Sequence, residues 1–287
     1  MPILSIWRSS GKFRIGAVCL AVLVLAAVFN GPIIDLLLGD GANPSEVGGP
    51  ATGRLFEDPS RTHLLGTDRY GRDWLGMILQ SLPITLTVST LAALITVAAG
   101  AIVGFTAGFL GGRTDTVLRS IMDLLLVVPT FPLILVLAAL VRGMNAVELA
   151  LVLSIFAWAG TGRIIRTQVL SLRERPYIEL SRMTNLSNGE IIVKDMMPNM
   201  LPYLGIQFAE RSIDAAFALV GLTVIGLAPN GLLDLGALIN LSLAWGVLSL
   251  GQYVIFAAPM VVLTVYFMAF ALINNGLEEF YNPRLRA

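Results

Sequence analysis

The sequence contains a single cysteine, Cys19, and a single histidine, His63. One cysteine excludes an intramolecular disulfide and any CxxC metal or redox motif. One histidine excludes a zinc site with several His ligands. We expect Cys19, which falls in an apolar run, to serve packing. We expect His63, which falls in a polar loop, to be solvated.

Charged residues are also scarce. They make up 13% of the 287 residues, whereas about 25% is usual in soluble domains. The 19 basic and 19 acidic residues cancel, so we expect no nucleic-acid partner. The hydrophobic share is 56% and the mean hydropathy is +0.79. These values exclude an ordinary soluble globule and a disordered chain, and they indicate a polytopic membrane protein.

Signatures of enzyme active sites are missing as well. The phosphate-binding pattern GxxxxGK[ST] is absent, because the one Gly-Lys pair, Gly11-Lys12, is followed by Phe13. Neither HExxH nor GxSxG occurs. We therefore predict a non-catalytic chain without a metal site. If ATP drives its activity, the ATPase is another chain.

Six apolar runs are long enough to cross a bilayer, which needs about 20 residues per helix. The sequence thus predicts an all-α bundle of about six spans. The first run lacks a small-x-small cleavage site, so an uncleaved span is favoured over a signal peptide. Two prolines, Pro129 and Pro132, are expected to kink the third. The six runs are Ile15–Leu38, Ile84–Leu110, Thr116–Val141, Val147–Ile165, Asn199–Leu227 and Leu250–Leu272.

The distribution of Lys and Arg predicts the orientation. With both termini in the cytoplasm, thirteen of the nineteen basic residues lie inside and five lie outside, with Arg211 inside a span. The long outer segment, Gly39–Leu82, is rich in turn residues, and a cap at Thr67 and Asp68 and a local Arg72–Asp73 pair are expected there. A second outer stretch, Ala228–Leu250, fits a re-entrant or interfacial element.

The long inner segment, Arg166–Pro198, begins with a predicted short helix. Pro176 suits the first turn of a helix, where its missing N–H costs nothing. Ile178–Thr184 can then be helical, and Asn185 can end the helix in a left-handed conformation.

A second short helix is predicted over Gly189–Met197. Ser187 or Asn188 can cap it, and Pro198 is expected to end it and to open the fifth span. Two interpretations are open for this inner segment. It is either a solvated loop or a docking surface for a partner.

The inner segment resembles the coupling-helix loop of ATP-binding-cassette importer permeases. The family pattern is Glu-Ala-Ala, three residues, Gly, nine residues, Ile-x-Leu-Pro. The stretch from Glu179 to Pro198 keeps this spacing, although only its two end residues match. Leu180, Ser181, Asn185, Asp195 and Met197 stand at the other positions.

Four further motifs are similar to the dipeptide/oligopeptide/nickel branch of that family. The resemblance extends from about His63 to Arg286 and identifies the chain as similar to the second, C-type permease of such importers. The motifs are HLLGTDRYGRD at 63–73, AGFLGGRTDT at 107–116, IMDLLLVVP at 121–129 and GLEEFYNPRLR at 276–286.

The resemblance implies a type I importer permease fold in one transmembrane domain over 1–287. Its parts would be a first span at about 15–38, a core at about 82–275 and a coupling loop at about 166–198. It implies a bacterial or archaeal plasma-membrane protein that pairs with a second, homologous permease, two ATPase subunits and an extracytoplasmic binding protein. No cofactor would be bound by this chain, and ATP and Mg would be held by the ATPases.

The resemblance also implies which residues contact the ATPase and what is carried. A peptide is the expected substrate; an oligosaccharide, glutathione or nickel is the alternative. A more distant alternative is a stand-alone secondary transporter or channel, which would not need the coupling loop. The implied coupling residues are Tyr177, Glu179, Leu180, Ser181, Arg182, Asn185, Ser187 and Asn188.

A polar stripe runs along the fifth span, because steps of three and four place its members on one helical face. Either the stripe lines the translocation path, or it lies in a cytoplasmic extension with Arg211 paired to Glu210, Asp214 or Asp123. Asp123 lies one turn after Arg119, which favours a structural ion pair over a substrate contact. The stripe is Asn199, Tyr203, Gln207, Glu210, Arg211 and Asp214, and the candidate path residues are Gln207, Glu210, Arg211, Asp214 and Asp123.

Overall fold

The computed structural model of the chain describes residues 7, 10–49, 52–141, 143–184, 186–227 and 232–281. Within these ranges the regular structure is helical, apart from two isolated antiparallel bridges that join Thr52 to Arg72 and Thr67 to Asp73. The all-helical fold expected from the sequence is confirmed.

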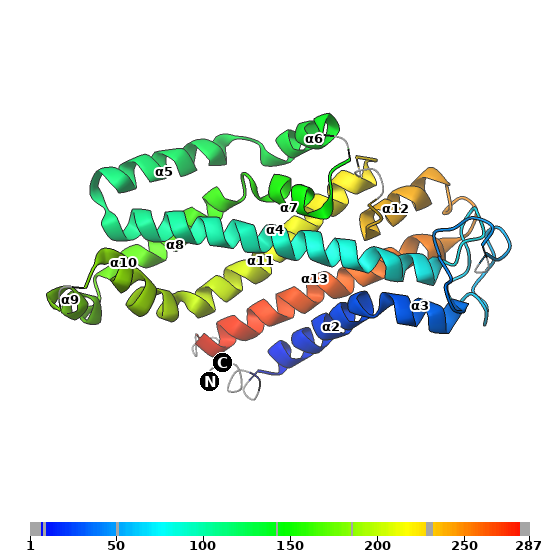
Figure 1. The fold of residues 1–287 in the computed structure, drawn as a ribbon, viewed down its shortest axis with the longest axis horizontal. Coiled ribbons are helices and arrows are strands. Elements are labelled where there is room, and N and C mark those ends of the chain that lie inside the picture. The colour runs from blue at the N-terminus through cyan, green and yellow to red at the C-terminus, as the bar shows by residue number, and fades with distance from the viewer. Residues whose placement is uncertain are drawn as a thin grey trace.

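A single long helix, α4 (Trp74–Leu110), runs through the length of the molecule (Figure 1). It packs against α8 (Trp158–Arg173) and α11 (Met197–Val224). On its other side α2 (Gly11–Val28) packs against α13 (Tyr253–Tyr281). In Figure 1 the short helix α9 lies at one end of this bundle and α12 lies toward the other, and we call these the α9 end and the α12 end.

Two of the expected spans are broken helices rather than single ones. The third consists of α5 (Gly112–Val127) and α6 (Thr130–Leu140), which meet at 77°. Pro129 disfavours helical geometry in the residue before it, and Val128 is indeed extended, with a ψ of 127°. The expected kink is therefore a complete break. The fourth consists of α7 (Ala146–Ser154) and α8, which meet at 55°.

Two other expected spans also differ from the prediction. The first expected span is divided at Phe29 into α2 and α3 (Asn30–Leu38). The second begins ten residues earlier than expected, because Pro83 lies inside α4 rather than at its start.

Length and apolar composition support three single-helix spans, α2, α4 and α13, and five if each bent pair counts as one. The sixth expected span, α11, has 28 residues and is long enough. Every stretch of 18 residues within it includes Glu210, Arg211 and Asp214, so it is not an apolar helix. Its place in the bundle comes from its packing against α4 and α13.

Glycines bring α4 and α8 into backbone contact. A Cβ on Gly104 would lie 2.7 Å from the carbonyl oxygen of Gly162, and one on Gly100 would lie 2.9 Å from the Gly162 nitrogen. A Cβ on Gly108 would lie 2.8 Å from Val169. This small-xxx-small spacing lets two membrane helices approach closely. We call the contact of Gly100, Gly104 and Gly108 with α8 the glycine seam.

The outer segment is more ordered than a solvated loop. The expected structural cap at Thr67 and Asp68 is confirmed, because Asp68 accepts from the Tyr70 and Arg72 N–H groups and Thr67 from the Glu57 N–H. The cap of α4 is Asp73, which accepts from the Gly76 N–H at 2.7 Å. His63 is not solvated either, because its Nδ1 lies 2.9 Å from the Asp73 carboxylate and its side chain is 13% exposed. The expected Arg72–Asp73 pair is also wrong.

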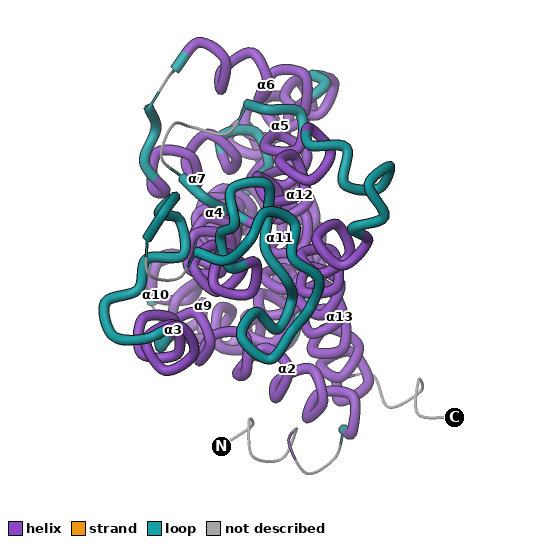
Figure 2. The backbone as a smooth tube through the Cα atoms, turned by 90° about the vertical axis from the view of Figure 1, so that its right-hand side faces the viewer, coloured by secondary structure: helices purple, strands orange, loops and turns teal. Residues whose placement is uncertain are grey.

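Arg72 pairs instead with the buried Asp68, at 2.6 Å. The guanidinium of Arg72 also lies 5.2 Å from the ring centre of Tyr70 and 5.9 Å from that of Trp245. Trp245 follows α12 (Leu235–Ala244), so these contacts connect the two outer segments. Figure 2 shows the molecule from the α12 end, where the loops gather in front of the helices.

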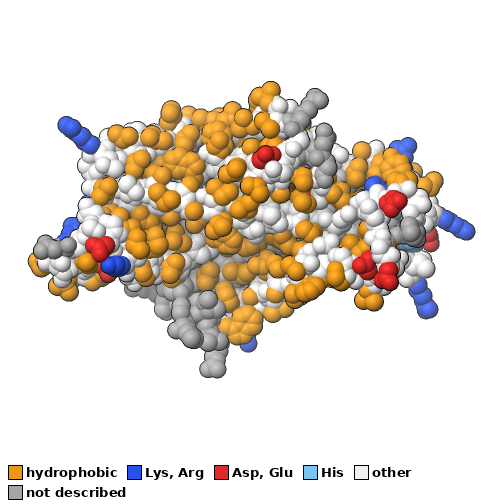
Figure 3. Space-filling model, in the orientation of Figure 1, with side chains coloured by type: hydrophobic (Ala, Val, Ile, Leu, Met, Phe, Trp, Pro, Cys, Tyr) orange, Lys and Arg blue, Asp and Glu red, His pale blue; other side chains and the backbone are white. Residues whose placement is uncertain are grey.

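Hydrophobic side chains cover the middle of the face seen in Figure 3, and most charged side chains lie toward its two ends. Many large apolar residues on the helices are exposed, among them Ile102, Leu124 and Val127. This distribution is the one expected of a bundle whose surroundings are lipid or other membrane helices.

Replacement of Gly104 by alanine tests the glycine seam. The added Cβ meets backbone that cannot move aside, so we expect Gly104→Ala to lower stability by about 1–3 kcal/mol. Gly160→Ala is the matched control, because the nearest atom to its Cβ is 3.7 Å away. The readout is the midpoint of thermal unfolding in detergent. Equal midpoints for the two variants would show that the seam is not close-packed.

Candidate functional site

The helix α9 (Pro176–Met183) projects from its end of the bundle (Figure 1). Pro176 occupies its first turn, as predicted. Two apolar side chains are largely exposed on it, Leu180 at 64% and Met183 at 74%. Tyr177 and Glu179 are also exposed. Exposed apolar side chains next to a carboxylate are typical of a surface that a partner covers.

The opposite side of α9 is fixed to the bundle. Ile178 is fully buried in a cluster that includes Phe109 of α4 and Val169 of α8. The guanidinium of Arg182 lies 5.3 Å from the ring centre of Phe109, within the range of a cation–π contact. Arg173 Nη1 donates to the Gly108 carbonyl at 3.2 Å. Arg182 is thus engaged with α4, and Ser181 bonds to the Tyr177 carbonyl of its own helix.

A cap begins the second inner helix, as predicted, and it is a capping box. The Ser187 hydroxyl accepts from the Glu190 N–H, and the Glu190 carboxylate accepts from the Ser187 N–H. Ser187, rather than Asn188, is therefore the cap. The ammonium of Lys194, 2.9 Å away, lowers the pKa of Glu190 to about 2, aided by the bonds from Ser187. Glu190 is therefore ionised at neutral pH.

The second inner helix does not end at Pro198, contrary to the prediction. The short α10 (Asn188–Glu190) continues into a π-helix (Ile191–Met196) and then directly into α11. Proline lacks an N–H and crowds the carbonyl four residues before it, and the wider π-turn lies just where this would occur. Asn185, the expected end of the first helix and a predicted coupling residue, lies outside the described residues.

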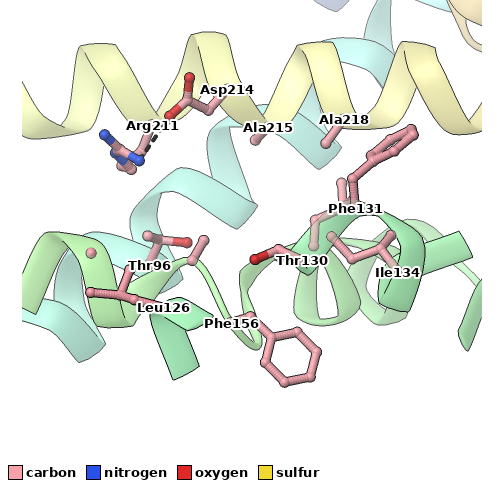
Figure 4. A pocket seen from close by; sticks show the side chains of 13 residues that line it. Thr96, Leu126, Thr130, Phe131, Ile134, Phe156, Arg211, Asp214, Ala215 and Ala218 are labelled. Atoms are coloured by element: carbon pink, nitrogen blue, oxygen red, sulfur yellow. Dashed lines mark ion pairs between the residues drawn. The ribbon is translucent and has the colours of Figure 1, made fainter. Parts of the chain in front are cut away.

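A cavity of about 310 Å³ lies between α11 and the helices α4 to α8. Figure 4 shows Arg211 and Asp214 of α11 on one side and Thr96, Leu126 and Thr130 across from them. Thr96 lies in the middle portion of α4, so the two charged residues lie beside that portion and not beyond the end of the bundle. The other residues that line the cavity are Phe131, Ile134, Leu153, Phe156, Ala157, Gly160, Ala215 and Ala218.

Arg211 pairs within its own helix. Its Nη1 lies 2.8 Å from the Asp214 carboxylate, and its Nη2 lies 3.8 Å from that of Glu210. Gln207 is buried and donates to Glu210 at 3.0 Å. Two of the predicted path residues, Arg211 and Asp214, line the cavity, whereas Gln207 and Glu210 do not.

Asp123 is held on α5, apart from the α11 group. Its carboxylate lies 3.5 Å from Arg119, which confirms the expected pair, and 3.6 Å from Arg163 of α8. It does not line the cavity. A neighbouring bidentate pair, Arg166 with Asp115 at 2.5 and 2.6 Å, joins the same two helices.

Three polar residues at or near the cavity were not identified from the sequence: Thr96, Thr130 and Arg163. Threonines in apolar helices often bond to their own backbone, so they give no sequence signal. Arg163 was counted only as a positive charge at the end of a span. Within the described residues, no three His, Cys, Asp or Glu side chains come together to hold a metal ion.

Comparison with known proteins adds an independent observation. Residues 97–287 match the family model described as the inner membrane component of binding-protein-dependent transport systems. The chain is 32% identical over 238 residues to the oligopeptide transport system permease protein OppC of Mycobacterium tuberculosis, covering 81% of this chain and 80% of the relative.

Two dipeptide transport system permease proteins named DppC are also similar. That of Bacillus subtilis is 28% identical over 281 residues, covering 98% of this chain and 85% of the relative. That of Lactococcus lactis subsp. cremoris is 31% identical over 226 residues, covering 77% of this chain but only 64% of the relative's length.

Cysteine labelling tests which residues of the α11 stripe are accessible. In a Cys19→Ser background, we expect Asp214→Cys to react rapidly with a charged thiol reagent in detergent, because the Asp214 side chain is 60% exposed. Gln207→Cys is expected to react slowly, because Gln207 is 3% exposed. Ala216→Cys, at a fully buried position of the same helix, sets the lower limit. Similar rates at 207 and 214 would contradict this arrangement.

Proposed function

This chain belongs to the family of binding-protein-dependent transport system inner membrane components, and from that premise we propose that it is one permease subunit of an ATP-driven peptide importer. The observation that carries the proposal is that the chain combines a projecting, anchored helix at one end of the bundle with a largely apolar cavity that Arg211 and Asp214 line. The relatives named as oligopeptide and dipeptide permeases support peptides as the substrate.

The exposed side of α9 is the proposed contact for an ATPase subunit. Its surface combines an aromatic residue, Tyr177, a carboxylate, Glu179, and two apolar side chains, Leu180 and Met183. Because the chain lacks a phosphate-binding loop, ATP and Mg would be held by the partner. Arg182 is assigned to anchoring, since it stacks on Phe109; Ser187 and Asn188 stay candidates for the contact.

The anchor explains how a displacement of α9 would reach the cavity. Ile178 joins α9 to both α4 and α8 in one apolar cluster, and the glycine seam holds those two helices together. Both helices also line the cavity, through Thr96 and Gly160. A closely packed interior transmits displacement instead of absorbing it. ATP-driven movement of α9 would therefore change the shape of the cavity.

The cavity wall on α11 is the proposed lining of the translocation path. Ionisable residues at membrane depth are costly unless they face a cavity, water or each other. Arg211 and Asp214 pair with each other and line the cavity. The open side of the cavity would face a second, homologous permease, so that the two chains enclose the path. Asp123 lies outside the cavity lining and is assigned to its ion pairs.

The proposed setting is the plasma membrane of a bacterium or archaeon, in one transmembrane domain with both termini in the cytoplasm. Lys12 near the N-terminus pairs with Glu279 near the C-terminus at 3.7 Å, which supports placing both on one side. The α9 end would then be cytoplasmic. The outer segment around Asp73 and Trp245 would face the binding protein that delivers the substrate.

Charge reversal on α9 tests the proposed coupling. We expect Glu179→Arg to abolish most peptide uptake while the chain still inserts, because the side chain is exposed and supports nothing inside the bundle. Glu174→Arg is the matched control, since that exposed carboxylate precedes α9. Uptake of a labelled peptide and the amount of chain in the membrane are measured together. Normal uptake by Glu179→Arg, or failure of the extracted chain to bring down any ATPase, would contradict the proposal.

A further inference from the structure

Three ionisable side chains on α11 leave a negative charge at the cavity. Glu210 and Asp214 are carboxylates, and Arg211 is the one guanidinium between them, so the group carries a net charge of −1. The closer pair, Arg211 with Asp214, lies on the cavity wall, and the Asp214 side chain is 60% exposed. Such an incompletely compensated carboxylate attracts a cation.

The helices across the cavity, α5 and α8, carry a group with a net positive charge. Arg119 and Arg163 share the single carboxylate of Asp123, at 3.5 and 3.6 Å, so this group carries a net charge of +1. The two arginine side chains are 61% and 59% exposed. Asp123 lies three residues before Leu126, and Arg163 lies three residues after Gly160. Both Leu126 and Gly160 line the cavity, so the positive group lies about one helical turn toward the α9 end.

A buried hydroxyl also points to a ligand. Thr96 is 2% exposed and lines the cavity, where its side chain faces the space below α11 (Figure 4). Its hydroxyl makes none of the hydrogen bonds to the preceding turn that Thr85, Thr90 and Thr106 of the same helix make. The rest of Thr96 is packed, and no other side chain or carbonyl of the described residues bonds to its hydroxyl, so the donor and acceptor of that hydroxyl are available to a polar ligand in the cavity.

From these three observations we propose that the cavity is a transit subsite for a zwitterionic peptide. The ammonium group of the peptide binds the carboxylate of Asp214 on the cavity wall, and its carboxylate faces Arg163 and Arg119, which lie beyond the lining residues one turn nearer the α9 end. Thr96 donates to or accepts from the peptide backbone between them. The inference rests on the proposed function and adds to it the chemistry of the substrate that the membrane subunit itself recognises.

The two opposite charges explain why the ligand is dipolar. The negative group lies on the α11 wall of the cavity, and the positive group lies beside the facing wall, one helical turn toward the α9 end. An anion or a cation alone would leave one of the two groups uncompensated, whereas a zwitterion compensates both. Loss of one charge-assisted hydrogen bond is expected to lower the preference for the charged end group about tenfold.

A ratio of uptake rates tests the ammonium site without interference from the binding protein. Tri-alanine and N-acetyl-tri-alanine are given to the complete importer, reconstituted with the same saturating binding protein and either wild-type chain or Asp214→Asn. We expect the substitution to lower the ratio of free to acetylated uptake about tenfold, with Asp214→Glu close to wild type. Glu174→Gln, outside the cavity, should leave the ratio unchanged.

The carboxylate site is tested in the same way with tri-alanine and its C-terminal amide. Arg163→Gln is expected to lower the ratio of acid to amide uptake and to leave the ratio of free to acetylated uptake unchanged. Parallel loss of both substrates in Asp214→Asn, with constant ratios, would show a structural role and overturn the subsite. Absence of tri-alanine uptake by the wild type would instead overturn the proposed function.

A protection experiment tests the subsite even if the binding protein does not bind the acetylated and amidated peptides. Ala215→Cys, on the cavity wall, is introduced into a Cys19→Ser background and labelled in the detergent-solubilised importer without binding protein. Tri-alanine at millimolar concentration is expected to slow labelling several-fold, and N-acetyl-tri-alanine is expected to protect much less. Equal protection by both peptides, or protection by neither, would overturn the proposal.

Discussion

The close contact between α4 and α8 is the interaction on which the rest of the structure depends. At Gly100, Gly104 and Gly108 the two helices meet without room for a side chain. Membrane helices gain little from hydrophobic exclusion against each other, so close packing of this kind is a main source of their association. The helices α11 and α7 then pack against α4, and α5 packs against both α4 and α8.

The same pair of helices connects the two candidate sites. Near its beginning α8 supplies Gly160 to the cavity, and its other end leads to α9 after two residues. On α4, Thr96 faces the cavity, and Phe109 lies under Arg182 of α9. The exposed surface of α9 and the cavity are therefore two ends of one packed unit.

Charge compensation explains why the charged helix α11 can lie inside the bundle. Glu210, Arg211 and Asp214 exclude α11 from the class of apolar helices, yet it runs beside the middle portion of α4. Such a helix is tolerated where its charges pair with each other and face a cavity. The pairs of Arg211 with Asp214 and Glu210 meet the first condition, and the position of Asp214 at the cavity meets the second.

The sequence by itself determined the helical class, most helix positions, the cap at Ser187, the Arg119–Asp123 pair and the family, because hydropathy, local capping and motif spacing are properties of neighbouring residues. The tertiary structure alone decided what depends on distant partners. The break between α7 and α8 falls at Ile155–Ala157, where no Pro or Gly marks it. His63 binds Asp73, Arg182 stacks on Phe109, and Thr96 joins Asp214 at one cavity only because folding brings separate helices together.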